Sequence, residues 1–531
     1  MEKMMKQAAM VTIPAEEYEA LKANAQQLQQ QVDYLLEQVR LARRRQFGAS
    51  SEKSEYDQIN LFDEAETYAM PLAAEPELCE VEKHTRRKRR EQSDRLPEDL
   101  PVEIVEHVLS EEEQICPVCE EPLHVMGKET VRRELKLIPA KAVIVEHVRY
   151  TYACRNCEKT GTDVPVIKAP MSEPVMKGSF ASPEAVAHLM TQKFVLGVPL
   201  YRQEQDWARQ GILLSRQTMS NWLIRCSKAW LEPIYELLKH QLLKRDVLHA
   251  DETTVQVLRE PGKAAQSNSY MWLYRTSGDA KHPIVLYEYQ PDRKKQRPKD
   301  FLNGFKGYLY TDGYAGYHSL PEGTTVVGCW AHARRKFDEA LKLVPQGKRG
   351  NSGPLVGKQF CDRLFAMEKE WAELPPKERL EKRRELAMPV LDEFSAWLKR
   401  QHPTKSAFGK AVSYAQDQWV YLVRYLMDGR LEISNNRAER SIKPFVISRK
   451  NFLFANTPGG AKASAVIFSL IETAKENGLN PYEYLRFLFQ ALPNRKEKPL
   501  EDFLPDSDRL PKKCYAPHAK DVLTTPAWDE T

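Results

Sequence analysis

Three acidic side chains lie in segments whose patterns indicate ordered structure. Asp312 lies near the end of the aromatic, alternating run 308–314, with Gly313 beside it. Asp251 lies within a second alternating run, residues 247–257, and Glu439 lies near the start of a later helical pattern. Carboxylates carried by separate elements suggest a site for a divalent cation such as Mg2+. Asp312 next to a glycine is also typical of an ordinary turn.

The sequence pattern leaves two of the three positions open. In an extended strand Asp251 and Glu252 point to opposite faces, and alternation does not tell which face carries the ligand. Glu439 lies three residues after Asn436, which also fits a helix-capping pair, and Glu432 is the other candidate. Two Asp and one Glu would suffice to hold two divalent ions at a phosphodiester, where such ions stabilise the attacking and leaving oxygens.

Four cysteines in two close pairs point to a second kind of metal site. The pairs are Cys116 with Cys119 and Cys154 with Cys157, and two strand candidates lie between them. Such pairs at strand ends bring four thiolates to one tetrahedral Zn2+, as in a zinc ribbon. A shell closed by four thiolates predicts a structural ion rather than a catalytic one. Nine cysteines in 531 residues are too few for a disulfide scaffold, which favours a reducing compartment.

Composition excludes several classes of protein. The chain has 79 basic and 74 acidic residues, so a nucleic-acid surface must come from local clusters rather than from net charge. No run approaches the roughly 18 apolar residues of a membrane span. Residues 1–17 contain no apolar core of the signal-peptide type. We therefore expect a soluble, cytoplasmic protein without a membrane partner.

The N-terminal region combines a heptad pattern with charged segments. Apolar residues recur at heptad spacing over residues 18–42, which predicts a short coiled coil and a homo-oligomer. An amphipathic helix packed on its own chain gives the same pattern. Residues 55–82 are acidic, and residues 86–90 are five consecutive cations. That basic run is either a solvated linker segment or a contact for a phosphate backbone.

Residues 200–226 divide into two helices around residues 211–214. Ser215 is the expected N-cap of the second helix. A helix-turn-helix presents the first turns of its second helix to DNA bases, although a plain helical hairpin has the same pattern. The candidate base-contacting residues are Arg216, Gln217, Thr218, Ser220 and Asn221.

Five strand candidates follow the helical region. Few helical residues separate the first three, which favours a mixed sheet over a doubly wound parallel one. Amphipathic segments over residues 355–428 predict a helical insert, and residues 461–488 predict a last helical region that packs on the sheet. The charged, proline-rich end predicts a disordered tail. The strand candidates are residues 247–257, 270–275, 284–289, 307–312 and 325–329.

Five segments resemble the signature blocks of the insertion-sequence-66 family of bacterial transposases. The likeness extends from the N-terminal heptads, through the cysteine pairs, to residues 469–475. It implies a ribonuclease-H-like catalytic domain whose DDE triad falls on Asp251, Asp312 and Glu439. It also implies two Mg2+ ions, with Mn2+ as the alternative, and a helical insert between the second and third acid. The segments are residues 249–253, 312–317, 329–337, 435–440 and 449–451.

The same resemblance places a Cys-x-x-His element on Cys329 and His332, either as a structural pair or close to the site. One position departs from the pattern, because DDE enzymes often carry Lys or Arg seven residues after the Glu, where this chain has Val446. The DNA-contact role then falls to other cations of the same region. These are Arg440, Lys443, Arg449 and Lys450.

These expectations describe a multidomain α+β protein. Its function would be that of a DNA transposase, which cuts at the terminal repeats of its element and uses the freed 3′-OH to attack target DNA, aided by small accessory proteins. The alternatives are a nuclease without strand transfer and a DNA-binding regulator with an inactive core. The expected parts are a coiled coil (1–46), a charged linker (47–110), a zinc ribbon (111–165), a helix-turn-helix region (175–235), a first catalytic part (245–345), a helical insert (346–429), a second catalytic part (430–490) and a disordered tail (491–531).

Overall fold

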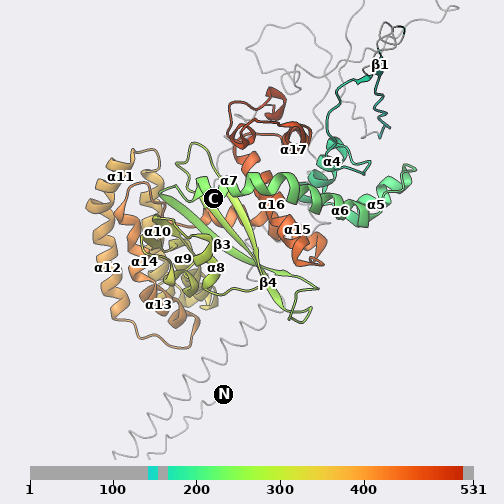
Figure 1. Ribbon diagram of the computed structural model, residues 1–531. Helices are drawn as coiled ribbons and strands as arrows, with labels where there is room; N and C mark the ends of the chain where they lie inside the picture. Colours follow the sequence, from blue (N-terminus) through green and yellow to red (C-terminus); the bar gives the residue numbers. More distant parts are fainter. Residues whose placement is uncertain (1–141, 154–158, 160–165, 518–531) are drawn as a thin grey trace, which may run out of the picture. The chain divides into compact units, whose positions relative to one another are not determined.

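The computed structural model describes residues 142–153, 159 and 166–517 (Figure 1). These residues belong to two compact units, one formed by Phe47–Ala169 and the other including Pro170–Thr531. The predicted coiled coil, the charged linker, the four paired cysteines and residues 518–531 lie outside the described part of the chain.

The smaller unit contains one antiparallel strand pair among its described residues. Strand β1 (Thr151–Ala153) pairs with β2 (Val166–Lys168). The Nε atom of Arg149 donates to the carbonyl of Ala169 at 2.8 Å and extends this pairing. A strand was predicted over residues 143–152, but the strand found there is Thr151–Ala153, and the Tyr150 carbonyl just before it accepts a bond from the N–H of Ala169 at 3.0 Å.

The larger unit is built on a five-stranded mixed sheet with the order β5-β4-β3-β6-β7. β3 pairs antiparallel with β4, and β4 with β5, whereas β3, β6 and β7 run parallel. The predicted mixed sheet and its five strands are thereby confirmed. The strands are β3 (Val247–Gln256), β4 (Asn268–Thr276), β5 (Val285–Gln290), β6 (Gly307–Tyr310) and β7 (Thr324–Val327).

A helix instead of a sixth strand closes the β5 edge of the sheet. Helix α16 (Pro458–Glu476) packs along β5. The backbone N–H of Tyr287 donates to the Ser469 hydroxyl at 2.7 Å, and that of Val285 donates to the Thr473 hydroxyl at 3.0 Å. These hydroxyls satisfy backbone groups that would otherwise offer an open edge for pairing.

The helices of the insert lie beside the sheet (Figure 1) and share a buried core with α9 and with Val247, Tyr310 and Val327 of the strands. Phe337 and Phe394 lie in this core. Arg383 is fully buried and binds Glu368 through Nε at 2.7 Å and the Leu431 carbonyl through Nη2 at 2.6 Å, so it ties the insert to the chain that returns to the sheet. The insert contains α10 (Gly353–Glu370), α11 (Pro376–Lys382), α12 (Met388–Lys399), α13 (Ala407–Asp417) and α14 (Trp419–Leu422), and α9 (Trp330–Leu343) precedes it.

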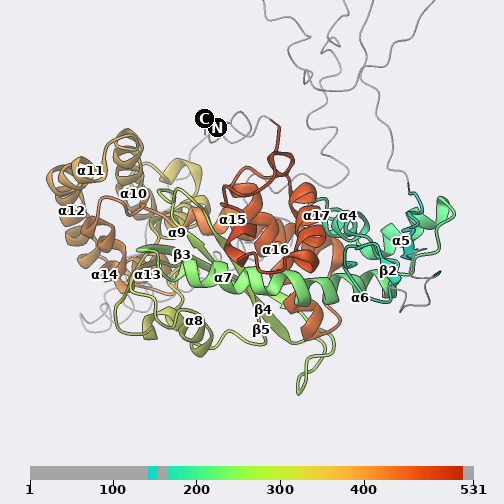
Figure 2. The same cartoon turned by 45° about the horizontal axis from the view of Figure 1, so that its top comes forward.

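Three of the four described helices that precede the sheet lie on the side of α16 away from the insert (Figure 2). They are α4 (Pro183–Phe194), α5 (Leu200–Arg209) and α6 (Arg216–Cys226). Gly211, with φ +81°, makes the turn between α5 and α6. The predicted cap of α6 is present, because the N–H of Thr218 donates to the Ser215 hydroxyl at 3.2 Å. Helix α7 (Glu232–Leu242) follows α6 through a short π-helical segment.

The end of the chain corrects one prediction. The tail was expected to be disordered from residue 491, but residues 492–517 fold against α17 (Pro481–Ala491). Phe503 and Leu510 are buried, and the Tyr484 hydroxyl donates to the Phe503 carbonyl at 2.7 Å. A few apolar residues spaced among the prolines and charges are enough to anchor this segment. No helix in the described ranges is long and apolar enough to cross a membrane.

Candidate active site

The three predicted acids come from neighbouring elements. Asp251 lies in β3, Asp312 follows β6, and Glu439 lies in the first turn of α15 (Asn436–Phe452). β3 and β6 are parallel with His249 opposite Tyr310, so Asp251 and Asp312 each follow that pair by two residues. Burial raises the pKa of Asp251 well above its usual range, and the charges of Glu252, Asp312 and Glu439 raise it further. The structure therefore brings the three carboxylates into one electrostatic cluster.

The two acidic neighbours in β3 have different surroundings. Helix α15 covers the Asp251 face, because Arg449 donates to the Thr253 hydroxyl at 3.1 Å. Glu252 points to the opposite face, and its side chain is only 2% exposed. Its Oε2 accepts a bond from the Tyr317 hydroxyl at 2.7 Å, and its Oε1 accepts one from Arg293 Nε at 2.7 Å. Glu252 therefore holds an arginine rather than offering a free carboxylate.

That arginine reaches the edge of the acidic cluster. Arg293 Nη2 lies 3.8 Å from Asp312 Oδ2. Its guanidinium lies 3.9 Å from the ring centroid of Tyr314, which adds a cation–π contact. Burial raises the pKa of Glu252, and the Asp312 charge adds to this, while the Arg293 charge opposes it. Glu252 is thus a positioning residue that keeps one positive charge beside Asp312.

Asp312 belongs to a turn as well as to the cluster. Its Oδ1 accepts a hydrogen bond from the N–H of Tyr314 at 2.9 Å, and Gly313 has φ +92°. A Cβ atom on Gly313 would come within 3.0 Å of Gln418 Oε1. The Tyr414 hydroxyl donates to the Asp312 carbonyl at 2.9 Å. The turn interpretation of Asp312 is therefore correct, and the turn fixes one carboxylate oxygen and leaves Oδ2 facing the cluster.

The capping interpretation of Glu439 is wrong. The N-cap of α15 is Asn435, not Asn436, and its side chain makes no capping bond. The carboxylate of Glu439 instead lies 3.0 Å from Arg335 Nη2 and 3.6 Å from His332 Nε2. Its Oε1 is buried without a hydrogen-bond partner in the described part of the chain. This oxygen is therefore free to accept an ion.

Glu432, the other candidate for the third acid, is held by protein groups. Its Oε1 accepts bonds from Arg437 Nε at 2.8 Å and from the N–H of Gly278 at 3.1 Å. Burial alone would raise the pKa of Glu432, but His249 and Arg437 lower it overall. Glu432 thus fixes the segment before α15.

A buried layer behind the acids was not predicted from the sequence. His249 Nδ1 lies 2.9 Å from Asn435 Oδ1, and Asn435 Nδ2 donates to the Ala250 carbonyl at 2.8 Å. The N–H of Asn435 donates to Cys329 Sγ at 3.1 Å. The His249 ring stacks on that of Tyr310 with centroids 4.6 Å apart. The signal was available, since His249 and Tyr310 each precede a predicted acid by two residues, but spacing alone does not show that they meet.

The residues predicted to contact DNA have mixed surroundings. On α6, Arg216, Gln217 and Asn221 are exposed, while Thr218 and Ser220 are half-buried. On α15, Arg440, Lys443 and Lys450 are exposed. Arg449 is half-buried and binds Thr253 of β3, so it joins α15 to the sheet. Val446 packs against the core.

Comparison with known families defines the class of protein as a transposase. Residues 178–463, more than half of the chain, match the model described as "Transposase IS66 family". The other matches are 113–158 with the zinc-finger binding domain of transposase IS66, 469–505 with the IS66 C-terminal element, and 34–105 with the model described as "Transposase C of IS166 homeodomain". The chain belongs to the IS66 family of transposases, as the sequence resemblance predicted.

Two relatives from Sinorhizobium fredii match over most of their length. The uncharacterized protein y4jD is 31% identical over 413 residues, which are 75% of this chain and 78% of that protein. The uncharacterized protein y4qI is 29% identical over 504 residues, 90% of this chain and 89% of that protein. The zinc-finger match over 113–158 contains Cys116, Cys119, Cys154 and Cys157, which supports structural Zn2+ in this region.

Proposed function

We propose that this chain is a DDE-type DNA transposase that hydrolyses a strand at the ends of its element and joins the freed 3′-OH to target DNA. The observation that carries the proposal is the convergence of Asp251, Asp312 and Glu439 from two parallel strands and a covering helix. The strand order, with three antiparallel strands followed by two parallel ones, supports the ribonuclease-H-like fold that the resemblance implies.

The acidic cluster fits a pair of divalent cations such as Mg2+, with Mn2+ as the alternative. The mutual repulsion that raises the pKa of Asp251 would be relieved by a cation, and Glu439 Oε1 has no hydrogen-bond partner among the described residues. Two such ions would stabilise the charge on the attacking and leaving oxygens of a phosphodiester. Hard carboxylate oxygens are the ligands that Mg2+ prefers.

Residues around the acids would orient them and bind the substrate. Arg335 and His332 hold the carboxylate of Glu439, and Asn435 fixes the first turn of its helix. Arg293 places a guanidinium beside Asp312, where it would contact a DNA phosphate.

The remaining parts would bring DNA to the site. The exposed residues of α6 would read the terminal repeats from the major groove, and Arg440, Lys443 and Lys450 of α15 would contact the DNA backbone. The zinc ribbon would contribute to end binding, and the N-terminal heptads would pair protomers. Small accessory proteins encoded by the same element would complete the assembly.

The test is cleavage of the element's own end DNA by the full-length chain. Asp312→Asn should abolish Mg2+-dependent strand cleavage while end binding, measured by gel shift, is retained. Asp338→Asn is the matched control, because Asp338 lies in α9 and pairs with Lys342 on the same helix. If Asp312→Asn still cleaves, the triad assignment is wrong. Cleavage without joining to target would identify a nuclease, and binding without cleavage by the wild type would identify a regulator.

A further inference from the structure

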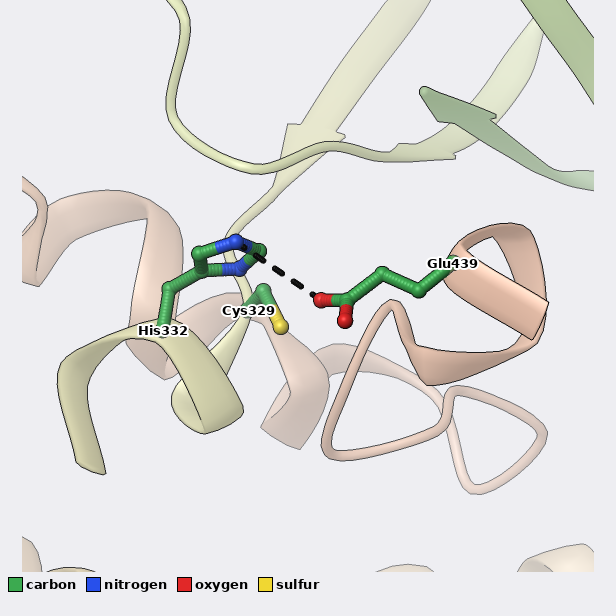
Figure 3. Close-up of side chains that lie close together, drawn as sticks. All are labelled: Cys329, His332 and Glu439. Atoms are coloured by element: carbon green, nitrogen blue, oxygen red, sulfur yellow. Dashed lines mark ion pairs between the residues drawn. The ribbon is translucent and has the colours of Figure 1, made fainter. Parts of the chain in front are cut away.

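Three side chains next to the acidic cluster form a group with different ligand chemistry. One ligand atom each from Cys329, His332 and Glu439 lies within 4.8 Å of the others (Figure 3). Cys329 is the N-cap of α9 and His332 lies in its first turn, so both point to one side of the helix start. Glu439 reaches the same point from α15, as Figure 3 shows.

The ligand set suits an ion of the zinc class rather than Mg2+. A thiolate, an imidazole and a carboxylate are the three ligand types that Zn2+ takes, whereas Mg2+ prefers oxygen alone. His332 Nε2 and Glu439 Oε1 are 3.6 Å apart. Ligand atoms of a tetrahedral Zn2+ with bonds of about 2.0–2.3 Å lie roughly 3.3–3.7 Å apart. Only the sulfur has to move inward to complete the three ligands.

Two buried atoms of this group lack partners in the part of the chain that the structure describes. These atoms are His332 Nδ1 and Glu439 Oε1. Buried polar atoms are usually hydrogen-bonded, so two buried atoms without a hydrogen bond in one group need a cause. A bound ion supplies one for Glu439 Oε1, which would bind the ion together with His332 Nε2, and His332 Nδ1 would then carry the ring proton. Cys329 Sγ already accepts the N–H of Asn435 at 3.1 Å, and such a bond also stabilises a metal-bound thiolate.

We propose that Cys329, His332 and Glu439 form a site for Zn2+ or a similar transition-metal ion, and that occupation of this site inhibits strand cleavage. The three protein ligands leave a fourth position for water. The same oxygens of Glu439 cannot bind this ion and the catalytic cations at the same time. Zinc bound at this site would therefore make the third acid of the triad unable to bind the catalytic cations. The inhibition rests on the proposed function, whereas the binding of the ion does not.

Binding is tested by Co2+ titration of the full-length chain purified without added zinc, so that zinc does not already fill the proposed site. The wild type should develop a thiolate-to-cobalt charge-transfer band and take up about one ion more per chain than Cys329→Ser, as one three-ligand site requires. Cys361→Ser is the matched control, because Cys361 is a buried free cysteine of the insert. The predicted zinc ribbon is the same in all variants. Its contribution to the cobalt spectrum therefore cancels when the spectrum of a variant is subtracted from that of the wild type. Equal spectra for the wild type and Cys329→Ser would overturn the site.

His332→Gln serves as a second variant if Cys329→Ser does not fold. His332 is partly exposed, with 21% of its side chain accessible, so its replacement disturbs the core less. It should also lose the cobalt band. Retention of the full band by a folded His332→Gln protein would contradict the proposal.

Inhibition is tested by adding Zn2+ to Mg2+-dependent end cleavage, with each variant compared with its own rate without zinc. The zinc concentration for half-inhibition should rise about 10- to 100-fold in Cys329→Ser and stay unchanged in Cys361→Ser. The same concentration in the wild type and Cys329→Ser would overturn the inhibitory role. If the wild type never cleaves, the proposed function fails, and the cobalt difference still decides whether the site exists.

Discussion

His249 Nδ1 lies 2.9 Å from Asn435 Oδ1, at the point where the central strand β3 meets the start of α15. His249 precedes Asp251 by two residues, and Asn435 precedes Glu439 by four. This one buried hydrogen bond therefore links the elements that carry the first and third acids. The position of the acidic cluster therefore depends on buried groups behind the acids.

Replacement of Asn435 by alanine should lower both stability and cleavage. Asn435→Ala leaves the Ala250 carbonyl and His249 Nδ1 buried without partners, which should cost about 2–3 kcal/mol in the free energy of unfolding. Urea unfolding followed by circular dichroism measures the change. Asn436→Ala is the control, because Asn436 is exposed and should cost less than about 0.5 kcal/mol. Equal unfolding midpoints for the two variants would contradict the role of Asn435.

The buried imidazole should make the fold sensitive to acid. Burial lowers the pKa of His249 to about 4, with Arg437 and Arg275 adding to this and Glu432 and Asn435 opposing it. The unfolded chain, with an ordinary pKa near 6.5, binds a proton first as pH falls, so the stability from this group is complete above about pH 6.5 and is lost toward pH 4.

His249→Gln isolates that contribution, because other groups of the site titrate in both proteins. Between pH 7 and pH 4 the wild type should lose roughly 3 kcal/mol more of its free energy of unfolding than the variant, the equivalent of about 2.5 pKa units. Chemical unfolding at a series of pH values gives the difference. Parallel curves for the two proteins would show that His249 is not held neutral.

Arg293 should matter for chemistry more than for folding. Its guanidinium lies beside Asp312, fixed by Glu252, so Arg293→Ala should reduce end cleavage by about 100-fold through loss of a positioned charge. Lys294→Ala is the control, because Lys294 is exposed and pairs with Asp292. Single-turnover cleavage and thermal unfolding separate the two effects. If Arg293→Ala cleaves as fast as Lys294→Ala, Arg293 does not act at the site.

The exposed face of α6 should set the preference for DNA sequence. Gln217 and Asn221 lie one helical turn apart, with Gln217 Nε2 3.4 Å from Asn221 Oδ1. Asn221→Ala should cost about 1–3 kcal/mol in binding to the element's own ends and little in binding to unrelated DNA. Lys228→Ala, a change at an exposed residue after α6, should weaken binding to both DNAs alike. Competition gel shifts measure the ratio of the affinities for the two DNAs. Equal losses of affinity for both DNAs would argue against base reading by α6.

Local patterns were sufficient for much of the fold. Alternation located the five strands, and Ser215 marked the start of α6, because these features depend on neighbours only a few residues away. The prediction of a disordered tail was wrong for residues 492–517. This segment is rich in charge, but it also contains a few apolar residues that pack on α17. Composition does not show which surface a short segment can cover.

By itself, the sequence indicated the family and the mixed sheet and named the candidate acids for a cation site, with two of the three positions left open. Only the tertiary structure decided how those acids are used. It paired Glu252 with Arg293, fixed Glu432 with Arg437, and turned Glu439 away from a helix cap toward His332 and Arg335. The reason is physical, since a carboxylate's role depends on which donors and charges lie within a few ångströms, and the partners of these acids lie 5 to 107 residues away along the chain.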